Sequence, residues 1–195
     1  MHRITKQLVF AALVAALAAP VAAQNLLTNP DFDLDPTVPG NGWSTTGTGA
    51  LLWNQAIGDP SPPSARTNQS GTESMILFQC VAITEGASYD FSARSYTHSS
   101  TAPATNGVSL SVFATVDCSG APIENIPTNQ GSFPNFALRE RVGYVTPVNA
   151  RSARIELLSD ANGAINHISW DNIMLGGPPV PVEAGTWGTI KALYK

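Results

Sequence analysis

The sequence predicts an all-β protein built as a β-sandwich. Three observations lead to this prediction. Apolar and polar residues alternate with a period of two in several segments, as they do in strands that bury one face. Glycine and proline occur 16 and 15 times in 195 residues, whereas only 12% of the residues are charged. A helical period of 3.6 residues is nearly absent before the C-terminal tail.

The expected strands follow one another along the chain and are separated by short turns. The first is a short strand near residues 51–53. Residues 75–83 are largely apolar on both faces, so this strand is expected between two layers. Further strands are expected at residues 89–94, 108–116, 142–148, 153–158 and 165–175. Many short strands between turn residues are typical of a sandwich.

The N-terminal residues 1–23 have the features of a signal peptide. Arg3 and Lys6 precede an apolar run from Leu8 to Ala23, which is shorter than the roughly 20 residues of a membrane-spanning helix. Small residues follow at the cleavage position. We therefore expect a secreted protein, extracellular or at the cell surface, with no transmembrane segment in the mature chain. The alternatives are an N-terminal membrane anchor and a buried helix.

The net charge and the cysteine content bear on the class of partner and on the disulfide. A net charge of −4 leaves no basic surplus for phosphates, so nucleic acid is not an expected partner. In an oxidising compartment, the two cysteines, Cys80 and Cys118, are expected to form a disulfide. Two buried free thiols are the alternative.

The residues after the last expected strand differ in composition. Residues 177–185 are rich in proline and glycine and predict a stiff, extended linker. Residues 186–195 predict a short helix capped by Thr186, with Trp187, Ile190 and Tyr194 on one face. Such a short helix needs a surface to dock on, either its own domain or a docking or sorting partner. Similar Trp-Gly tails end some secreted bacterial proteins.

Four stretches carry a resemblance to a known family. They are residues 25–33 (NLLTNPDFD, followed by Gly42-Trp43), 77–93 (with LFQCVAI and YDFSA), 142–157, and 168–175 (ISWDNIML). In this order they resemble the family 4/9 carbohydrate-binding modules. The resemblance covers residues 25–176 and implies a galactose-binding-domain-like jelly roll. It also implies a polysaccharide or a cell-surface glycan as the partner.

The resemblance also implies a metal ion. Members of this fold commonly hold a structural Ca²⁺ where the opening and closing strands meet, which here implies Asp33 and Asp171 as ligands. Asp31, Asp33 and Asp35 would crowd three carboxylates onto one strand face, which a cation would relieve. The alternative is that Asp33 and Asp171 are turn caps.

Sugar binding needs aromatic rings that stack on a pyranose, flanked by fixed hydrogen-bonding groups. Trp53 ends a short strand, and Tyr96, accompanied by Arg94, leads into a polar loop. For both rings, ordinary packing is an equal alternative. Gln79 contacts sugar by analogy with the family, or it is a buried strand residue satisfied by backbone.

The motifs of common enzymes are missing from the sequence. We therefore expect a secreted, non-catalytic polysaccharide-binding module. One alternative is a cell-surface structural or adhesive sandwich that is anchored or docked through its C-terminal tail. A small carbohydrate-active enzyme that uses Asp90 or Glu140 is another.

Overall fold

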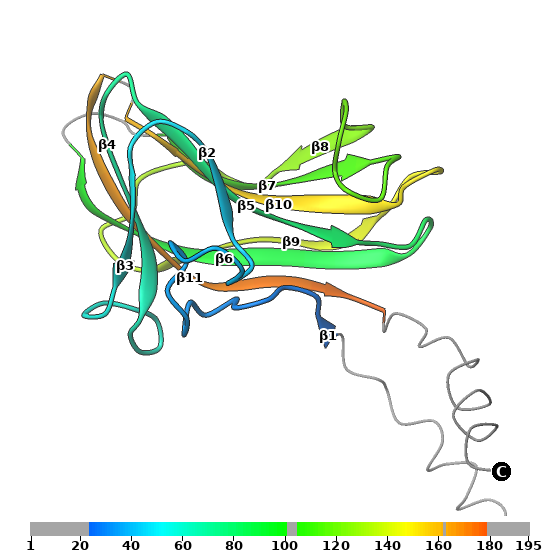
Figure 1. Ribbon diagram of the computed structural model, residues 1–195, viewed down its shortest axis with the longest axis horizontal. Helices are drawn as coiled ribbons and strands as arrows, with labels where there is room; N and C mark the ends of the chain where they lie inside the picture. The colour runs from blue at the N-terminus through cyan, green and yellow to red at the C-terminus, as the bar shows by residue number, and fades with distance from the viewer. Residues whose placement is uncertain (1–23, 101–104, 162, 179–195) are drawn as a thin grey trace, which may run out of the picture.

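The computed structural model describes residues 24–100, 105–161 and 163–178, and every element in these ranges is a strand (Figure 1). The strands are β1 (Gln24–Asn25), β2 (Ser44–Gly47), β3 (Ala50–Asn54), β4 (Ser64–Gly71), β5 (Ser74–Ala82), β6 (Ser88–Ser100), β7 (Thr105–Phe113), β8 (Glu124–Pro127), β9 (Ala137–Val145), β10 (Ser152–Asp160) and β11 (Ala164–Gly177). The all-β prediction is confirmed.

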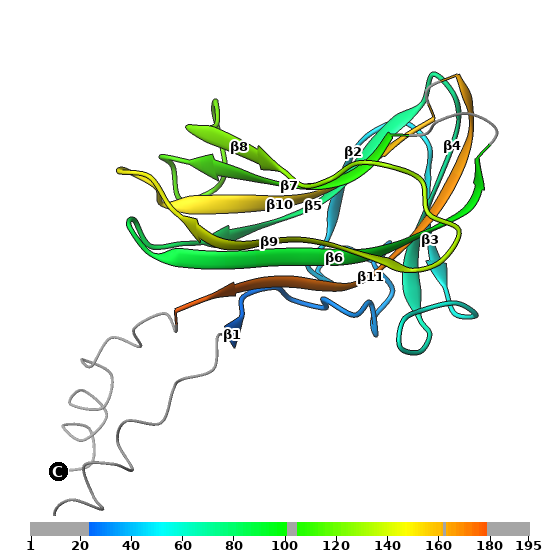
Figure 2. The same cartoon turned by 180° about the vertical axis from the view of Figure 1, so that it is seen from behind.

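The strands form two antiparallel sheets packed face to face. One, which we call the β11 sheet, has the order β3-β4-β11-β6-β9, and β1 pairs with the end of β11. The other, the β10 sheet, has the order β2-β5-β10-β7-β8. The view from behind in Figure 2 shows the same two layers. Most consecutive strands alternate between the layers, with β3–β4 and β7–β8 as the exceptions, and the sandwich has the connectivity of a jelly roll.

The core lies between the sheets and follows the period of two. Ile155 and Leu157 on β10 face inward and are fully buried, as are Ile168 and Trp170 on β11. Burying each such side chain contributes about 1.5–3 kcal/mol. Trp43 belongs to the same core cluster.

The two ends of the described chain lie side by side. Asn25 pairs with Gly176, and the Leu26 amide donates to the carbonyl of Leu175 at 2.9 Å. Further along, the Ile173 amide donates to the Pro30 carbonyl at 3.0 Å. The expected meeting of the opening and closing strands is therefore confirmed.

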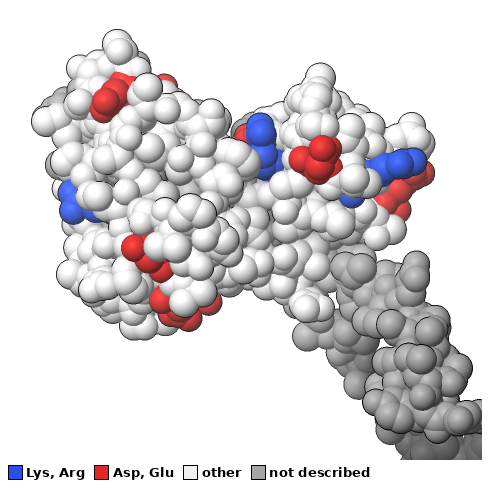
Figure 3. Space-filling view, viewed as in Figure 1, with Lys and Arg blue, Asp and Glu red and all other residues white. Residues whose placement is uncertain are grey.

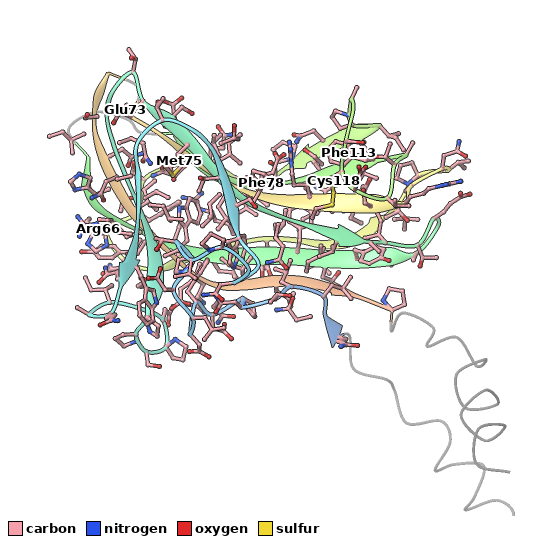
Figure 4. The ribbon with its side chains drawn as sticks, in the orientation of Figure 1. Arg66, Glu73, Met75, Phe78, Phe113 and Cys118 are labelled. Atoms are coloured by element: carbon pink, nitrogen blue, oxygen red, sulfur yellow. A yellow bond between two sulfur atoms is a disulfide. The ribbon has the colours of Figure 1, made fainter. Side chains whose placement is uncertain are left out.

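The predicted disulfide between Cys80 and Cys118 is confirmed. Cys80 lies on β5, and Cys118 lies in the loop after β7 (Figure 4). In the chain-entropy model, closing a loop with a sequence separation of 38 stabilises the fold by about 4 kcal/mol.

Three strands were not expected from the sequence: β2, β4 and β8. The buried inward residues of β4 are Ala65, Thr67 and Gln69, two of them polar, so the strand lacks an apolar alternation. β9 begins at Ala137, five residues before the expected start, and β7 ends at Phe113. The predicted signal peptide at 1–23, most of the linker at 177–185 and the helix at 186–195 lie outside the described residues.

Candidate functional site

The outer face of the β10 sheet carries rows of residues that cross its strands. Antiparallel register places Ser44, Phe78, Glu156 and Ser109 opposite one another on β2, β5, β10 and β7. The neighbouring row, containing Leu77, Leu157 and Val108, is fully buried or nearly so. Because successive residues of a strand point to opposite faces, the Phe78 row points outward.

The next outward row places Arg154 at the centre of this face. In register, it lies between Cys80 on β5 and Ser111 on β7. Its guanidinium forms a 2.6 Å salt bridge with Glu156 and lies 5.0 Å from the centre of the Phe78 ring. The other Glu156 oxygen accepts a 3.0 Å hydrogen bond from Ser109. Arg154 is thus held in place by two neighbours, and its side chain remains 30% exposed.

We call this surface the Phe78 face. It is defined by Ser44, Phe78, Glu156, Ser109, Arg154, Ser111 and Asn125. Asn125 on β8 extends the polar groups toward that edge, donating to the Ser111 hydroxyl at 2.7 Å. Figure 4 places Phe78 and Phe113 on the upper side of the molecule, and Figure 3 shows that side hollowed between two raised ends.

A glycine contributes to the shape of this face. An ideal Cβ on Gly107 would lie 2.9 Å from the Gln130 side chain, so only glycine leaves Gln130 room there. Gly107 lies opposite Leu158, which places it in an outward row of the sheet. The surface therefore combines a half-buried aromatic ring with positioned donors and acceptors. Such groups stack on and hydrogen-bond to a ligand.

The four sugar-binding residues predicted from the sequence do not lie together. Arg94 and Tyr96 are neighbours on β6, but they point outward from the β11 sheet, opposite the Phe78 face. The Trp53 indole donates to the Phe32 carbonyl at 2.8 Å. The Gln79 amide accepts from the Thr28 N–H at 2.7 Å and donates to the Thr28 carbonyl at 2.9 Å. Trp53 and Gln79 thus hold the opening segment in place.

Sequence reasoning missed Phe78 as a surface residue because both faces of its strand are largely apolar. Arg154 and Glu156, two residues apart on β10, form a salt bridge on this face. A usable signal was present: an Arg-x-Glu pair shares one face of a strand whose other face is apolar.

Several carboxylates lie near the predicted calcium ligand Asp171. Asp171 is 2% exposed, and burial raises its pKa to about 6, with Asp31 and Asp59 raising it further. Burial and Asp33 raise the pKa of Asp31. Among the carboxylates of the opening segment, Asp31 thus raises the pKa of Asp171, and Asp33 raises the pKa of Asp31.

Protein donors already contact Asp171. Its two carboxylate oxygens accept the amides of Asp59 at 2.6 Å and of Asn172 at 2.8 Å. In the described ranges no three His, Cys, Asp or Glu side chains are grouped to hold a metal. Ca²⁺ takes six to eight oxygens, so a site here would draw on loop carbonyls and water besides Asp31 and Asp171.

Comparisons with known proteins identify the fold. No known family and no curated protein matches the sequence. Among solved structures, the enzymatically active domain of bacteriophage CBA120 tailspike protein 4 matches with a TM-score of 0.62 and 15% identity over 79% of this chain. The chain spans only 21% of that tailspike chain.

Two carbohydrate-binding modules match over nearly their whole length. One is a family 61 module in complex with β-1,4-galactotriose, with a TM-score of 0.58, 14% identity, and coverage of 80% of this chain and 100% of the module. The other is the second family 22 xylan-binding domain of Paenibacillus barcinonensis Xyn10C, with a TM-score of 0.55, 15% identity, and coverage of 76% and 98%.

These likenesses show that the chain has the jelly roll found in several families of carbohydrate-binding modules. They do not single out family 4/9, which stays a prediction. Across the described part of the chain, no helix is long and apolar enough to span a membrane.

Proposed function

We propose that this protein binds a polysaccharide across the Phe78 face. The observation that carries the proposal is the outward row Ser44, Phe78, Glu156 and Ser109, which crosses four strands. Strands lie about 4.8 Å apart, so the row is longer than a single sugar ring. Phe78 supplies the stacking surface, and Arg154 with Glu156 supplies fixed hydrogen-bonding groups.

The neighbouring structures support the ligand class. Two modules with this jelly roll are described as bound to β-1,4-galactotriose and as xylan-binding. Figure 3 shows few charged side chains on the visible surface, which suits a neutral glycan. The proposal includes secretion, supported by the disulfide and the predicted signal peptide. It also includes a non-catalytic role, because Glu156 is engaged with Arg154 and Ser109.

A structural Ca²⁺ near Asp31 and Asp171 is also part of the proposal. Its support is the burial of Asp171 beside two other carboxylates, Asp31 and Asp59. A bound cation would offset this repulsion and join the opening segment to β11. No step of glycan binding depends on it.

Native affinity electrophoresis in gels containing xylan, galactan, mannan or β-glucan tests the function. We expect retardation by at least one polymer and a loss of most of it in Phe78→Ala. Val116→Ala, which truncates an apolar side chain that is 70% exposed in the loop after β7, is the matched control and should migrate like the wild type. Unretarded migration in all four gels, or equal retardation of Phe78→Ala and wild type, would reject the proposal.

A further inference from the structure

A pocket lies on the side of the sandwich opposite the Phe78 face, on the outer face of the β11 sheet. It has a volume of about 310 Å³ and is lined by Tyr96 on β6, by Ala56, Ile57, Gly58 and Pro62, and by residues 134–136. Ser95 and Thr97 point into the core and are buried. Tyr96 between them therefore points outward, away from the Phe78 face.

The first wall of the pocket is a loop that the sheet holds firmly. The Asp59 amide donates to Asp171 on β11 at 2.6 Å, and the Asp59 carboxylate pairs with Arg94 on β6 at 2.6 Å. Ser64 donates to the Ile57 carbonyl at 2.6 Å. An ideal Cβ on Gly58 would clash with the carbonyl oxygen of Ser61 in the same loop. The loop is thus tightly packed and bonded to both β11 and β6.

The second wall is held by a buried cation. Arg139 is 3% exposed and donates to the Ser95 hydroxyl at 2.7 Å and to the Gly131 carbonyl at 2.6 Å. Its guanidinium lies 4.6 Å from the centre of the Phe133 ring. The Phe133 carbonyl also accepts the Thr97 amide at 2.8 Å. These contacts fix the chain just before residues 134–136, so the pocket is formed before any ligand arrives.

The lining is aromatic and uncharged. The centres of the Tyr96 and Phe136 rings lie 5.7 Å apart, and the His98 ring packs against Tyr96 in a tilted arrangement, with the ring centres 4.3 Å apart. Ile57, Pro62 and Pro134 add apolar surface, and Asn135 adds an amide. An uncharged, aromatic lining favours neutral sugar rings over anionic groups. A volume of about 310 Å³ is at the small end for ligand pockets, which suits about one or two rings.

We propose that this Tyr96 pocket is a second glycan site, which takes the terminal sugars of a neutral chain while the Phe78 face holds a chain interior. The proposal rests on the proposed function only for its ligand class. The outer faces of two packed sheets point in opposite directions, so one molecule engages two chains at once. Such bivalence raises retention on a polymer without any new contact.

The test is an NMR titration of the amide signals with four separate probes: xylohexaose, cellohexaose, mannohexaose and β-1,4-galactotriose. For at least one probe we expect two sets of shifting signals, one around Phe78 and one around Tyr96 and Phe136. Tyr96→Ala should weaken binding at the pocket at least tenfold and leave the Phe78 set unchanged. Phe78→Ala should do the reverse, and Tyr96→Phe, which keeps the ring, should retain pocket binding.

The outcomes separate the two proposals. Shifts around Phe78 without shifts around Tyr96 would reject the second site and leave the proposed function standing. Shifts at neither place with all four probes would reject both. Loss of both sets in a Tyr96→Ala variant that keeps a native spectrum would show one coupled site rather than two.

Discussion

The two outer faces of the sandwich are built in different ways. The Phe78 face is made by strand residues, and pairing register alone brings Phe78, Glu156 and Ser109 together. The Tyr96 pocket is lined by one strand residue, and its other lining residues come from two loops. One loop is held by Asp59 and the other by Arg139. A site on paired strands therefore survives loop changes that would remove a site between loops.

Removing the disulfide should have the largest effect and should weaken the fold nearest the Phe78 face. Cys80 is in register with Arg154, so the disulfide borders this face. We expect the Cys80→Ala, Cys118→Ala double variant to lose about 4 kcal/mol of unfolding free energy. Urea denaturation measures it. A loss below about 1 kcal/mol would show that the disulfide constrains little.

Arg139→Ala should damage the pocket side instead. It removes a buried cation together with its bonds to Ser95 and Gly131, which should cost about 2–4 kcal/mol. Burial lowers the pKa of Arg139 only to about 10, so the group is charged at neutral pH. The neighbouring exposed Arg141→Ala is the control and should change stability by less than about 0.5 kcal/mol. Equal effects in the two variants would contradict the assigned role.

Lowering the pH should reduce the contribution of His98, which lies beside the Tyr96 pocket, to the free energy of unfolding. Its pKa is lowered to about 4, mainly by burial and further by Arg66 and His167. An unfolded histidine has a pKa of about 6.5, so between pH 4 and 6.5 the unfolded chain binds more protons. His98 therefore contributes stability that rises with pH across that window.

Asp171 has the opposite effect over nearly the same range, because its pKa is raised to about 6. In the wild type the contributions of His98 and Asp171 offset each other, and His98→Asn removes the rising contribution of His98. Thermal unfolding at pH 4.5 and pH 6.5 should show that the variant gains less stability with rising pH than the wild type. Parallel pH profiles would contradict the burial of His98.

Calcium should have the smallest effect. If the cation sits beside Asp171, the melting temperature should be higher in Ca²⁺ than in EDTA, because ligands that bind the folded state stabilise it. Asp31→Asn should reduce that difference more than Asp33→Asn, since Asp31 is the carboxylate that acts on Asp171. Identical melting temperatures in Ca²⁺ and EDTA would reject the proposed calcium site.

Much of the fold was predictable because buried strands carry a strong period of two. The strand at residues 89–94 was expected and lies within β6, and the opening and closing segments were expected to be neighbours and are. β4 was not predicted because most of its buried side chains are polar, among them Thr67, which shares a hydrogen bond of 2.7 Å with Ser159. Local alternation cannot reveal a strand whose inward residues find polar partners far along the chain.

The site was less predictable because it depends on pairing. Sequence alone paired Arg94 with Tyr96 on one strand but could not show that Trp53 and Gln79 bond to the opening segment. Nor could it show that Phe78 and Arg154 share an outward surface, because that follows from the register of β5 with β10. Tyr96 was identified as an aromatic candidate, but its pocket is made by loops that carry no periodic signal.

A crystal structure with bound oligosaccharide would test the central claim most directly. The crystals would be soaked in xylohexaose or β-1,4-galactotriose, whichever binds more tightly in solution. We predict sugar rings lying across β5, β10 and β7, with one ring against Phe78 and hydroxyls bonded to Arg154 or Glu156. A saturating soak that leaves this face bare, with sugar bound only elsewhere on the molecule, would contradict the account.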